Sequence, residues 1–213
     1  MFTGLVHALG GIKKIQPFGR GRRLEIDISG LKASIGIGQS LAVNGVCLTV
    51  AALAGEVASF DVVAETVGRS NLSFAKPGDR VNLEPPLRIG DALDGHMVLG
   101  HVYAIAKVLT IDDKNPDNRI LRMSLPAEIR RLVAEKGSIA VDGISLTVAE
   151  VGVDYFTTAL IPLSWEKTTI SLRKPGDQVN LEADLLARYA ARLIECGGSG
   201  GLTLGFLHKH GFA

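Results

Sequence analysis

The stretch Ser40-Leu-Ala-Val-Asn-Gly-Val-Cys-Leu-Thr-Val50 occurs again as Ser138-Ile-Ala-Val-Asp-Gly-Ile-Ser-Leu-Thr-Val148, with seven of eleven positions identical at an offset of 98 residues. A second block has the same offset. Lys76-Pro-Gly-Asp-Arg-Val-Asn-Leu-Glu84 returns as Lys174-Pro-Gly-Asp-Gln-Val-Asn-Leu-Glu182, with one difference in nine positions. The chain is therefore a tandem duplication.

The duplicated copies consist of short strands. At an offset of 96, Thr3-Gly-Leu-Val6 corresponds to Leu99-Gly-His-Val102, which places the seam near residue 95. Runs of Val, Ile, Leu and Thr at period two, broken by Gly, Asn and Asp, are typical of β-strands. About 90 residues of short strands per copy favour a small closed antiparallel barrel, because closure leaves no exposed strand edge. We expect two such barrels, at residues 1–95 and 96–183.

The remaining region predicts a helix. Asp184-Leu-Leu-Ala-Arg-Tyr-Ala-Ala-Arg-Leu-Ile194 has its apolar residues on one helical stripe, and Gly197-Gly198 is a typical helix end. Asp184 stands where a helix N-cap is expected. We expect a helix at residues 184–197, followed by a flexible tail at 198–213.

Composition excludes several classes of protein. The chain has 213 residues, 46% hydrophobic residues and a formal net charge of +1, which gives no field that would attract nucleic acid or an anionic membrane. No window approaches the ~18 uninterrupted apolar residues of a membrane-spanning helix, and no basic stretch precedes the apolar start. The two cysteines, Cys47 and Cys196, form no disulfide framework or zinc pattern. We expect a cytoplasmic protein.

The repeated block contains a polar strand face. The apolar alternation shifts by one position across Asn44-Gly45, which indicates a turn or bulge. Cys47 and Thr49 therefore share the strand face opposite the apolar positions that follow the turn. Ser145 and Thr147 repeat this arrangement in the second copy. Such paired small side chains suit a ligand pocket; the alternative is a surface threonine and a buried, inert cysteine.

Two histidines lie near the seam. His96 and His101 are five positions apart, which places them on opposite faces of a strand and argues against a shared metal ion. One imidazole facing a pocket and a purely structural histidine both remain open. Lys136 and Lys167 are by default solvated charges.

Several motifs in fixed order resemble the riboflavin synthase family. They are Met1-Phe-Thr-Gly-Leu-Val6, Asn44-Gly-Val-Cys-Leu-Thr-Val50, Gly95-His-Met-Val-Leu-Gly-His-Val102, Lys136-Gly-Ser-Ile-Ala-Val-Asp-Gly-Ile-Ser-Leu-Thr-Val148 and Leu160-Ile-Pro162. The resemblance runs from Met1 to about Leu193. It implies an all-β fold of two tandem six-stranded antiparallel Greek-key barrels with a C-terminal α-helix, which joins three copies into a homotrimer.

The resemblance also implies site residues. It implies one ligand site lined by Gly4, Leu5, Val6, Cys47, Leu48, Thr49, Asp61, Val62, Val63, Ala64, Glu65, Thr66, Gly100, His101 and Val102. It implies a second site lined by Lys136, Ser145, Leu146, Thr147, Ile161, Pro162, Leu163, Ser164, Trp165 and Glu166. The residues that it ties to catalysis are Cys47, His101, Ser145, Asp184 and Ser40.

The implied reaction is the last step of riboflavin biosynthesis. Two molecules of 6,7-dimethyl-8-ribityllumazine exchange a four-carbon unit and give riboflavin and 5-amino-6-ribitylamino-pyrimidinedione. The implied reaction needs no metal and no cofactor. Lumazine synthase is a further implied partner. Two identical substrates need two similar pockets, which a duplicated domain supplies, and holding them together removes about 7–11 kcal/mol of association entropy from the barrier.

A non-catalytic alternative has the same fold. Lumazine- or flavin-binding antenna proteins would be expected to lose the polar residues of the second copy. Here Lys136, Ser145, Thr147 and Asp184 persist, which favours the enzyme. The chain departs from the usual family pattern at Asp94, Tyr103, Leu163-Ser164-Trp165 and Ile170-Ser171, and these departures affect the pocket rims. A purely structural trimerisation protein would not explain the paired polar strand faces.

Overall fold

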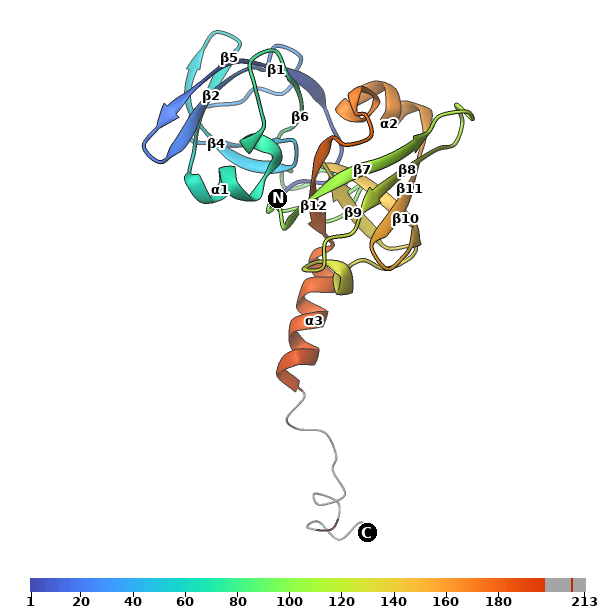
Figure 1. Ribbon diagram of the computed structural model, residues 1–213. Coiled ribbons are helices and arrows are strands. Elements are labelled where there is room, and N and C mark those ends of the chain that lie inside the picture. Colours follow the sequence, from blue (N-terminus) through green and yellow to red (C-terminus); the bar gives the residue numbers. More distant parts are fainter. Residues whose placement is uncertain (198–207, 209–213) are drawn as a thin grey trace.

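The computed structural model describes residues 1–197 and residue 208, and consists of two closed β-barrels and one long C-terminal helix (Figure 1). The tail expected at 198–213 lies outside the described residues, apart from His208. No helix among the described residues is long and apolar enough to cross a membrane.

The two barrels have the same topology. The first contains β1 (Ala8–Phe18), β2 (Gly21–Asp27), β3 (Ser40–Val43), β4 (Val46–Ala54), β5 (Val57–Val62) and β6 (Arg80–Glu84), with α1 (Ala64–Arg69) and the 3₁₀ helix η1 (Asn71–Ser73) between β5 and β6. Its strands close in the order β1-β2-β5-β4-β3-β6, with every neighbour antiparallel.

The second barrel repeats this order with its own six strands. They are β7 (Ala104–Asp112), β8 (Arg119–Ser124), β9 (Ser138–Val141), β10 (Ile144–Val151), β11 (Tyr155–Leu160) and β12 (Gln178–Ala183). The 3₁₀ helix η2 (Arg130–Leu132) precedes β9, while α2 (Pro162–Lys167) and η3 (Thr169–Leu172) lie between β11 and β12. The duplicated six-stranded antiparallel barrels expected from the sequence are confirmed.

A two-residue turn explains the shift in apolar alternation. Asn44 and Gly45 have φ angles of 46° and 75°, and Asp142 and Gly143 have φ angles of 47° and 77°. Two consecutive positive φ angles are the signature of a type I′ hairpin turn, which Asn-Gly and Asp-Gly favour. After the turn, alternate residues of β4 and β10 point into separate barrel cores.

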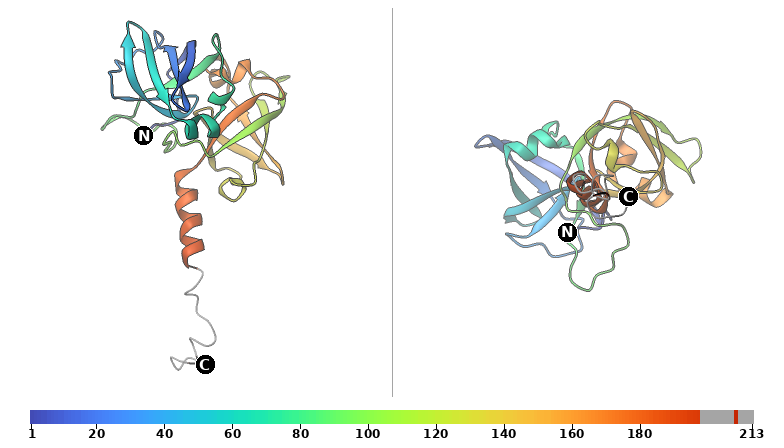
Figure 2. Two further views of the ribbon diagram at one scale, coloured as in Figure 1. Left: turned by 60° about the vertical axis from the view of Figure 1, so that its left-hand side comes forward. Right: turned by 90° about the horizontal axis from the view of Figure 1, so that it is seen from below.

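These two turns meet where the barrels touch. A Cβ added to Gly45 would lie 2.6 Å from the nitrogen of Gly143, so only glycine permits this approach. Asparagine side chains cross the boundary on both sides of the turns. Asn82 Nδ2 donates to the carbonyl of Asp142, and Asn180 Nδ2 donates to the carbonyl of Asn44. The two barrels, which lie side by side in Figure 2, are therefore joined by hydrogen bonds.

The segments that precede the barrels are exchanged between them. The N-terminal segment (residues 2–6) lies against the second barrel, where Val6 packs on the core and the carbonyl of Gly4 accepts from Ser145 N at 2.7 Å. The linker segment (residues 98–102) lies against the first barrel, where Val102 packs on the core and the carbonyl of Gly100 accepts from Cys47 N at 2.9 Å. The two segments pair through an antiparallel bridge between Phe2 and Val98.

The C-terminal helix α3 (Leu185–Gly197) projects away from the barrels, near their junction (Figures 1 and 2). Oδ1 of Asp184 accepts a hydrogen bond of 2.8 Å from the nitrogen of Leu186, so the predicted N-cap is confirmed. The expected C-terminal helix is also confirmed, with Leu185 as its first residue.

Candidate active site

Each barrel presents a polar stretch on the outside of one strand. On β4, Leu48 points into the first core, whereas Cys47 is half-buried and Thr49 is exposed. Ser145 and Thr147 on β10 have the same degrees of exposure. The prediction that the polar and apolar residues of these strands occupy opposite faces is confirmed. The apolar face points into the barrel, and the polar face lies on its outside. We call the surroundings of Cys47 the first site and those of Ser145 the second site.

The exchanged segments form one wall of each site. A Cβ added to Gly100 would lie 2.5 Å from Cβ of Cys47, and one added to Gly4 would lie 2.7 Å from Cβ of Ser145. Both glycines have φ angles near +78°, at +77° and +79° respectively. Each position therefore requires glycine for two reasons: its positive φ angle and its close approach to the neighbouring strand.

The exchange corrects one expectation. The family resemblance implied that residues 4–6 share one ligand site with Cys47, but the structure places this segment beside Ser145 in the second site. The reason is packing: Val6 is half-buried against the second core, while Val102, its counterpart, fills the same position in the first barrel. Gly100, His101 and Val102 do belong with Cys47, as expected.

Three of the expected ligand residues face the barrel cores. Leu48 and Val62 are buried in the first core, with 5% and 1% of their surfaces exposed, and Leu146 is buried in the second, with 7% exposed. These residues can therefore reach a ligand only through their main chains. Ser40 is half-buried and pairs with Thr49 across β3 and β4, so it lies beside the polar strand face.

The other expected residues lie at strand ends. Residues 63–66 follow β5 where α1 begins, and residues 161–166 follow β11 where α2 begins. Val63, Ile161 and Leu163 are each about 60% exposed, at 62%, 60% and 61%, so they present apolar surface to solvent. These positions stay predicted site residues.

Charged groups mark the rims of both sites. Asp61 accepts two hydrogen bonds from Arg23, of 2.5 and 2.8 Å, and this guanidinium lowers the pKa of the carboxyl. Lys136 is exposed and has a φ of 64°, a strained backbone conformation for a lysine. Trp165 packs against the second core, and the guanidinium of Arg119 lies 4.9 Å from its ring centroid.

An imidazole that the sequence did not assign to the site contacts Ser145. Nδ1 of His96 lies 2.7 Å from Oγ of Ser145, and only 8% of the histidine is exposed. Its Nε2 has no hydrogen-bond partner among the described residues. Burial lowers the pKa of His96, and the charge of Asp184 opposes this shift. The ring is therefore neutral at pH 7 and able to exchange a proton with the serine.

His96 was missed because it lies outside the repeated blocks. The sequence indicated only that one of the two histidines could face a pocket. The main-chain N–H of His96 donates to the carbonyl of Thr3 at 3.0 Å, so the exchanged N-terminal segment brings the ring to Ser145. A Cβ on Gly95 would lie 2.0 Å from the same carbonyl oxygen. Glycine directly before histidine was the available signal. His101, by contrast, is exposed.

Comparison with known proteins agrees with this duplicated arrangement. The model of the lumazine binding domain matches twice, at residues 3–85 and 99–184. Riboflavin synthase of Mycobacterium tuberculosis H37Rv is 43% identical over 204 residues, which cover 93% of this chain and 100% of the relative. The chain belongs to the riboflavin synthase family. The Brucella abortus enzyme of this family is 40% identical over 92% of this chain and 98% of its own, and that of Bacillus subtilis is 32% identical over all of both.

Solved structures with the same fold include complexes with ligands. LumP complexed with riboflavin has a TM-score of 0.77 and 25% sequence identity, and covers 86% of this chain and 99% of its own. LumP complexed with 6,7-dimethyl-8-(1'-D-ribityl) lumazine has a TM-score of 0.76 and 23% identity over the same fractions.

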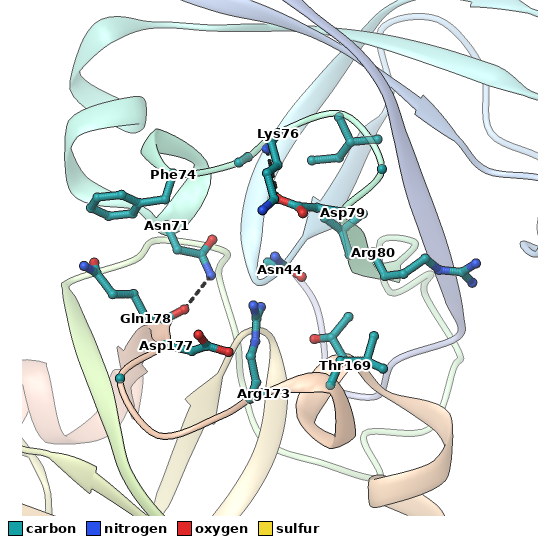
Figure 3. Close-up of a pocket in the computed structure, with 16 residues that line it drawn as sticks. Asn44, Asn71, Phe74, Lys76, Asp79, Arg80, Thr169, Arg173, Asp177 and Gln178 are labelled. Atoms are coloured by element: carbon teal, nitrogen blue, oxygen red, sulfur yellow. Dashed lines mark hydrogen bonds between the residues drawn. The ribbon is translucent and has the colours of Figure 1, made fainter.

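A hollow lies between the barrels and is distinct from both sites. It has a volume of about 550 Å³ and is lined by residues from both copies, including Phe74, Lys76 and Arg80 of the first (Figure 3). On its second-barrel side, Arg173 donates to the fully buried carboxylate of Asp142 at 2.6 Å. None of the expected ligand residues lines this hollow. Among the residues that the structure describes, no three His, Cys, Asp or Glu side chains cluster as metal ligands would.

Proposed function

We propose that the chain converts two molecules of 6,7-dimethyl-8-ribityllumazine into riboflavin and 5-amino-6-ribitylamino-pyrimidinedione by transfer of a four-carbon unit. Membership of the riboflavin synthase family supports this reaction. One observation in the structure carries the catalytic part: the contact between His96 and Ser145 in one of two matching sites. A carrier protein needs a pocket, but it needs no proton-transfer pair beside it.

We assign the proton transfers to the second site. The neutral imidazole of His96 can take the proton of Ser145, or that of a group bound beside it, because burial has lowered the pKa of the ring. The 7-methyl protons of the lumazine are unusually acidic, so a modest base suffices to remove one. Asp184 lies at the start of α3 and its negative charge favours the protonated imidazole that results.

We assign the nucleophile to the first site. The thiol of Cys47 is half-buried and lies against Gly100 of the linker segment. Its sulfur is the more polarisable and more nucleophilic atom of the equivalent positions 47 and 145, which suits addition to an electron-poor ring. The two sites thus have the same backbone frame and different chemistry, as a reaction between two identical molecules requires.

The C-terminal helix supports assembly into an oligomer. The apolar face of α3 is exposed and consists of Leu186, Tyr189, Leu193 and Ile194, with 65%, 64%, 71% and 77% of their surfaces accessible. A helix of 13 residues is marginal alone in water and gains stability when this face is covered. We propose that α3 joins three copies, so that a first site and a second site of different subunits meet. A cytoplasmic location and an association with lumazine synthase stay predictions.

A turnover assay tests the proposed reaction. Purified protein is incubated with the lumazine in buffer that contains a metal chelator, and both products are quantified by chromatography. We expect riboflavin and the pyrimidinedione in equal amounts. Binding of the lumazine without either product would instead identify a carrier protein.

Two variants with a matched control test the assigned residues. His96→Gln should lower kcat by about a hundredfold or more, as expected for loss of a general base. Cys47→Ser should lower kcat, whereas Cys196→Ser, at the exposed second cysteine on α3, should leave it unchanged. Melting temperatures within a few degrees of the wild-type value would show that the variants are folded. Normal turnover by the folded His96→Gln variant would contradict the assignment.

A further inference from the structure

We propose that Glu84 and Glu182 are positioning residues that act crosswise, each carboxylate at the end of one barrel holding the wall of the other barrel's ligand site. Glu84 is the last residue of β6 in the first barrel, and Glu182 lies near the end of β12 in the second. The proposal rests on the proposed two-site function only for the identity of the ligands.

Glu84 binds the wall of the second site. Its Oε1 accepts hydrogen bonds from the nitrogen and the hydroxyl of Thr3, at 2.6 and 2.8 Å, and its Oε2 accepts from the nitrogen of Gly4 at 3.0 Å. The carbonyl of Gly4 in turn accepts from the nitrogen of Ser145. One carboxylate from the first barrel therefore determines where the glycine that touches Ser145 lies.

Glu182 binds the wall of the first site in the same way. Its Oε1 accepts from the nitrogen of Leu99 at 2.7 Å, and its Oε2 accepts from the nitrogens of Gly100 and His101, both at 2.9 Å. The peptide unit that joins Gly100 to His101 is held at both ends, because its carbonyl accepts from Cys47 and its N–H donates to Glu182. Its orientation beside the thiol is thereby determined.

The chemistry of these contacts favours a carboxyl group over an amide. Three donors converge on each side chain, and a carboxyl group offers two oxygens that can accept, whereas an amide offers one. Glutamine has nearly the same shape but would turn an NH₂ group toward an N–H donor. Replacing either glutamate by glutamine would therefore lose at least one of these contacts.

Stability alone does not explain two buried carboxylates. Only 4% of Glu84 and 5% of Glu182 is exposed, and within the described part of the chain neither carboxylate forms an ion pair with lysine or arginine. Burial raises the pKa of Glu84, and it raises the pKa of Glu182 to about 7, against the effect of the N–H donors. Burying such charges costs free energy. Their benefit is the orientation of the exchanged segments.

The experiment uses thiols at the two equivalent positions as reporters. All proteins carry Cys196→Ser. One series keeps Cys47 as its reporter, and the other combines Cys47→Ser with Ser145→Cys. The rate of alkylation by iodoacetamide is measured with and without riboflavin, in the full chain, with Glu84→Gln or Glu182→Gln added to each series. The rate without riboflavin reports the geometry of each wall whether or not the protein turns over lumazine.

The crosswise proposal predicts opposite specificities. Glu182→Gln should change the alkylation rate of Cys47 about tenfold and weaken its protection by riboflavin, while the thiol at position 145 changes less than about twofold. Glu84→Gln should give the reverse pattern. Equal changes at both reporters, no change at either, or a change confined to the barrel that carries the substitution would each overturn the proposal.

A milder variant decides the question if the glutamine variants do not fold. Thr3→Val removes a single hydroxyl donor to Glu84 and keeps the shape of the side chain. It should alter the reporter at position 145 and leave Cys47 unchanged. The linker segment has Leu99 at the equivalent position, so the first site contains no such hydroxyl and serves as the internal control. An unchanged reporter at position 145 would count against the role of Glu84.

Discussion

Replacing Arg173 by alanine should lower the free energy of unfolding by about 3 to 5 kcal/mol, because the carboxylate of Asp142 stays buried without its cation. Asp142 is 0% exposed, and the Arg173 side chain is 20% exposed, so water screens this ion pair poorly. Asn71 Nδ2 and the nitrogen of Asn180 still donate to Oδ1 of Asp142, each at 2.8 Å, and these bonds limit the loss.

The duplication supplies the matched control. In the first barrel the positions equivalent to Asp142 and Arg173 are Asn44 and Ala75, which form a neutral pair in the same fold. The double variant Asp142→Asn with Arg173→Ala copies that pair into the second barrel. We expect it to cost only about 1 kcal/mol, because Asn retains the Oδ1 acceptor and no buried charge remains. The single change Asp142→Asn should lie between these values.

Urea unfolding at one protein concentration measures all four proteins of this cycle. The single tryptophan, Trp165, lies at the second core and reports its unfolding by fluorescence. The coupling energy is the double-variant change minus both single changes. A loss below about 1 kcal/mol for Arg173→Ala, or a double variant as unstable as the sum of the single ones, would refute the reasoning.

Gly4→Ala should lower kcat by roughly a hundredfold, because the added Cβ displaces Ser145. Gly19 also has a positive φ but open space around it, so Gly19→Ala should retain activity. Comparing the melting temperatures of the two variants distinguishes steric overlap with Ser145 from the strain of an alanine at positive φ. Burial raises the pKa of Glu182 to about 7 from an ordinary 4.5, so its contribution to stability is complete below pH 4.5 and is lost as the pH rises through 7. The unfolding free energy of the wild type minus that of Glu182→Gln should therefore fall by up to about 3 kcal/mol between about pH 5 and 8, and a rise would contradict this sign. Replacing the apolar face of α3 by glutamines should convert an oligomer into monomers in sedimentation velocity at unchanged circular dichroism; a monomeric wild type would contradict the assembly.

Local patterns predicted the parts of the fold that local physics determines. Asn44-Gly45 indicated a turn, because few residues other than asparagine and glycine accept two successive positive φ angles. The stripe after Asp184 predicted α3, because helical period and N-cap are both local properties. Both predictions needed only neighbouring residues. The constant repeat offset then extended the turn prediction from the first barrel to the second.

The exchange of segments could not be predicted in the same way. The match of residues 3–6 with 99–102 shows that the segments are equivalent, but it does not show which barrel each one covers. Val6 satisfies the same pattern on either core. The choice depends on long-range packing and on hydrogen bonds such as those that the N-terminal segment donates to Glu84. The same limit explains why His96 was not assigned to Ser145.

The differences between the two sites bear on the reaction more directly than their likeness does. In a dismutation, two identical molecules take opposite roles, and two identical sites would give neither molecule a preference. Three features distinguish the second site from the first. Its strand has Ser145 where the first site has Cys47, His96 lies beside that serine, and Asp184 stands at the start of α3. All three differences concern the second site, whereas the glycine contacts and the glutamate bonds are common to both. We infer that the shared frame positions the two lumazines alike and that the second site alone makes one of them the proton donor.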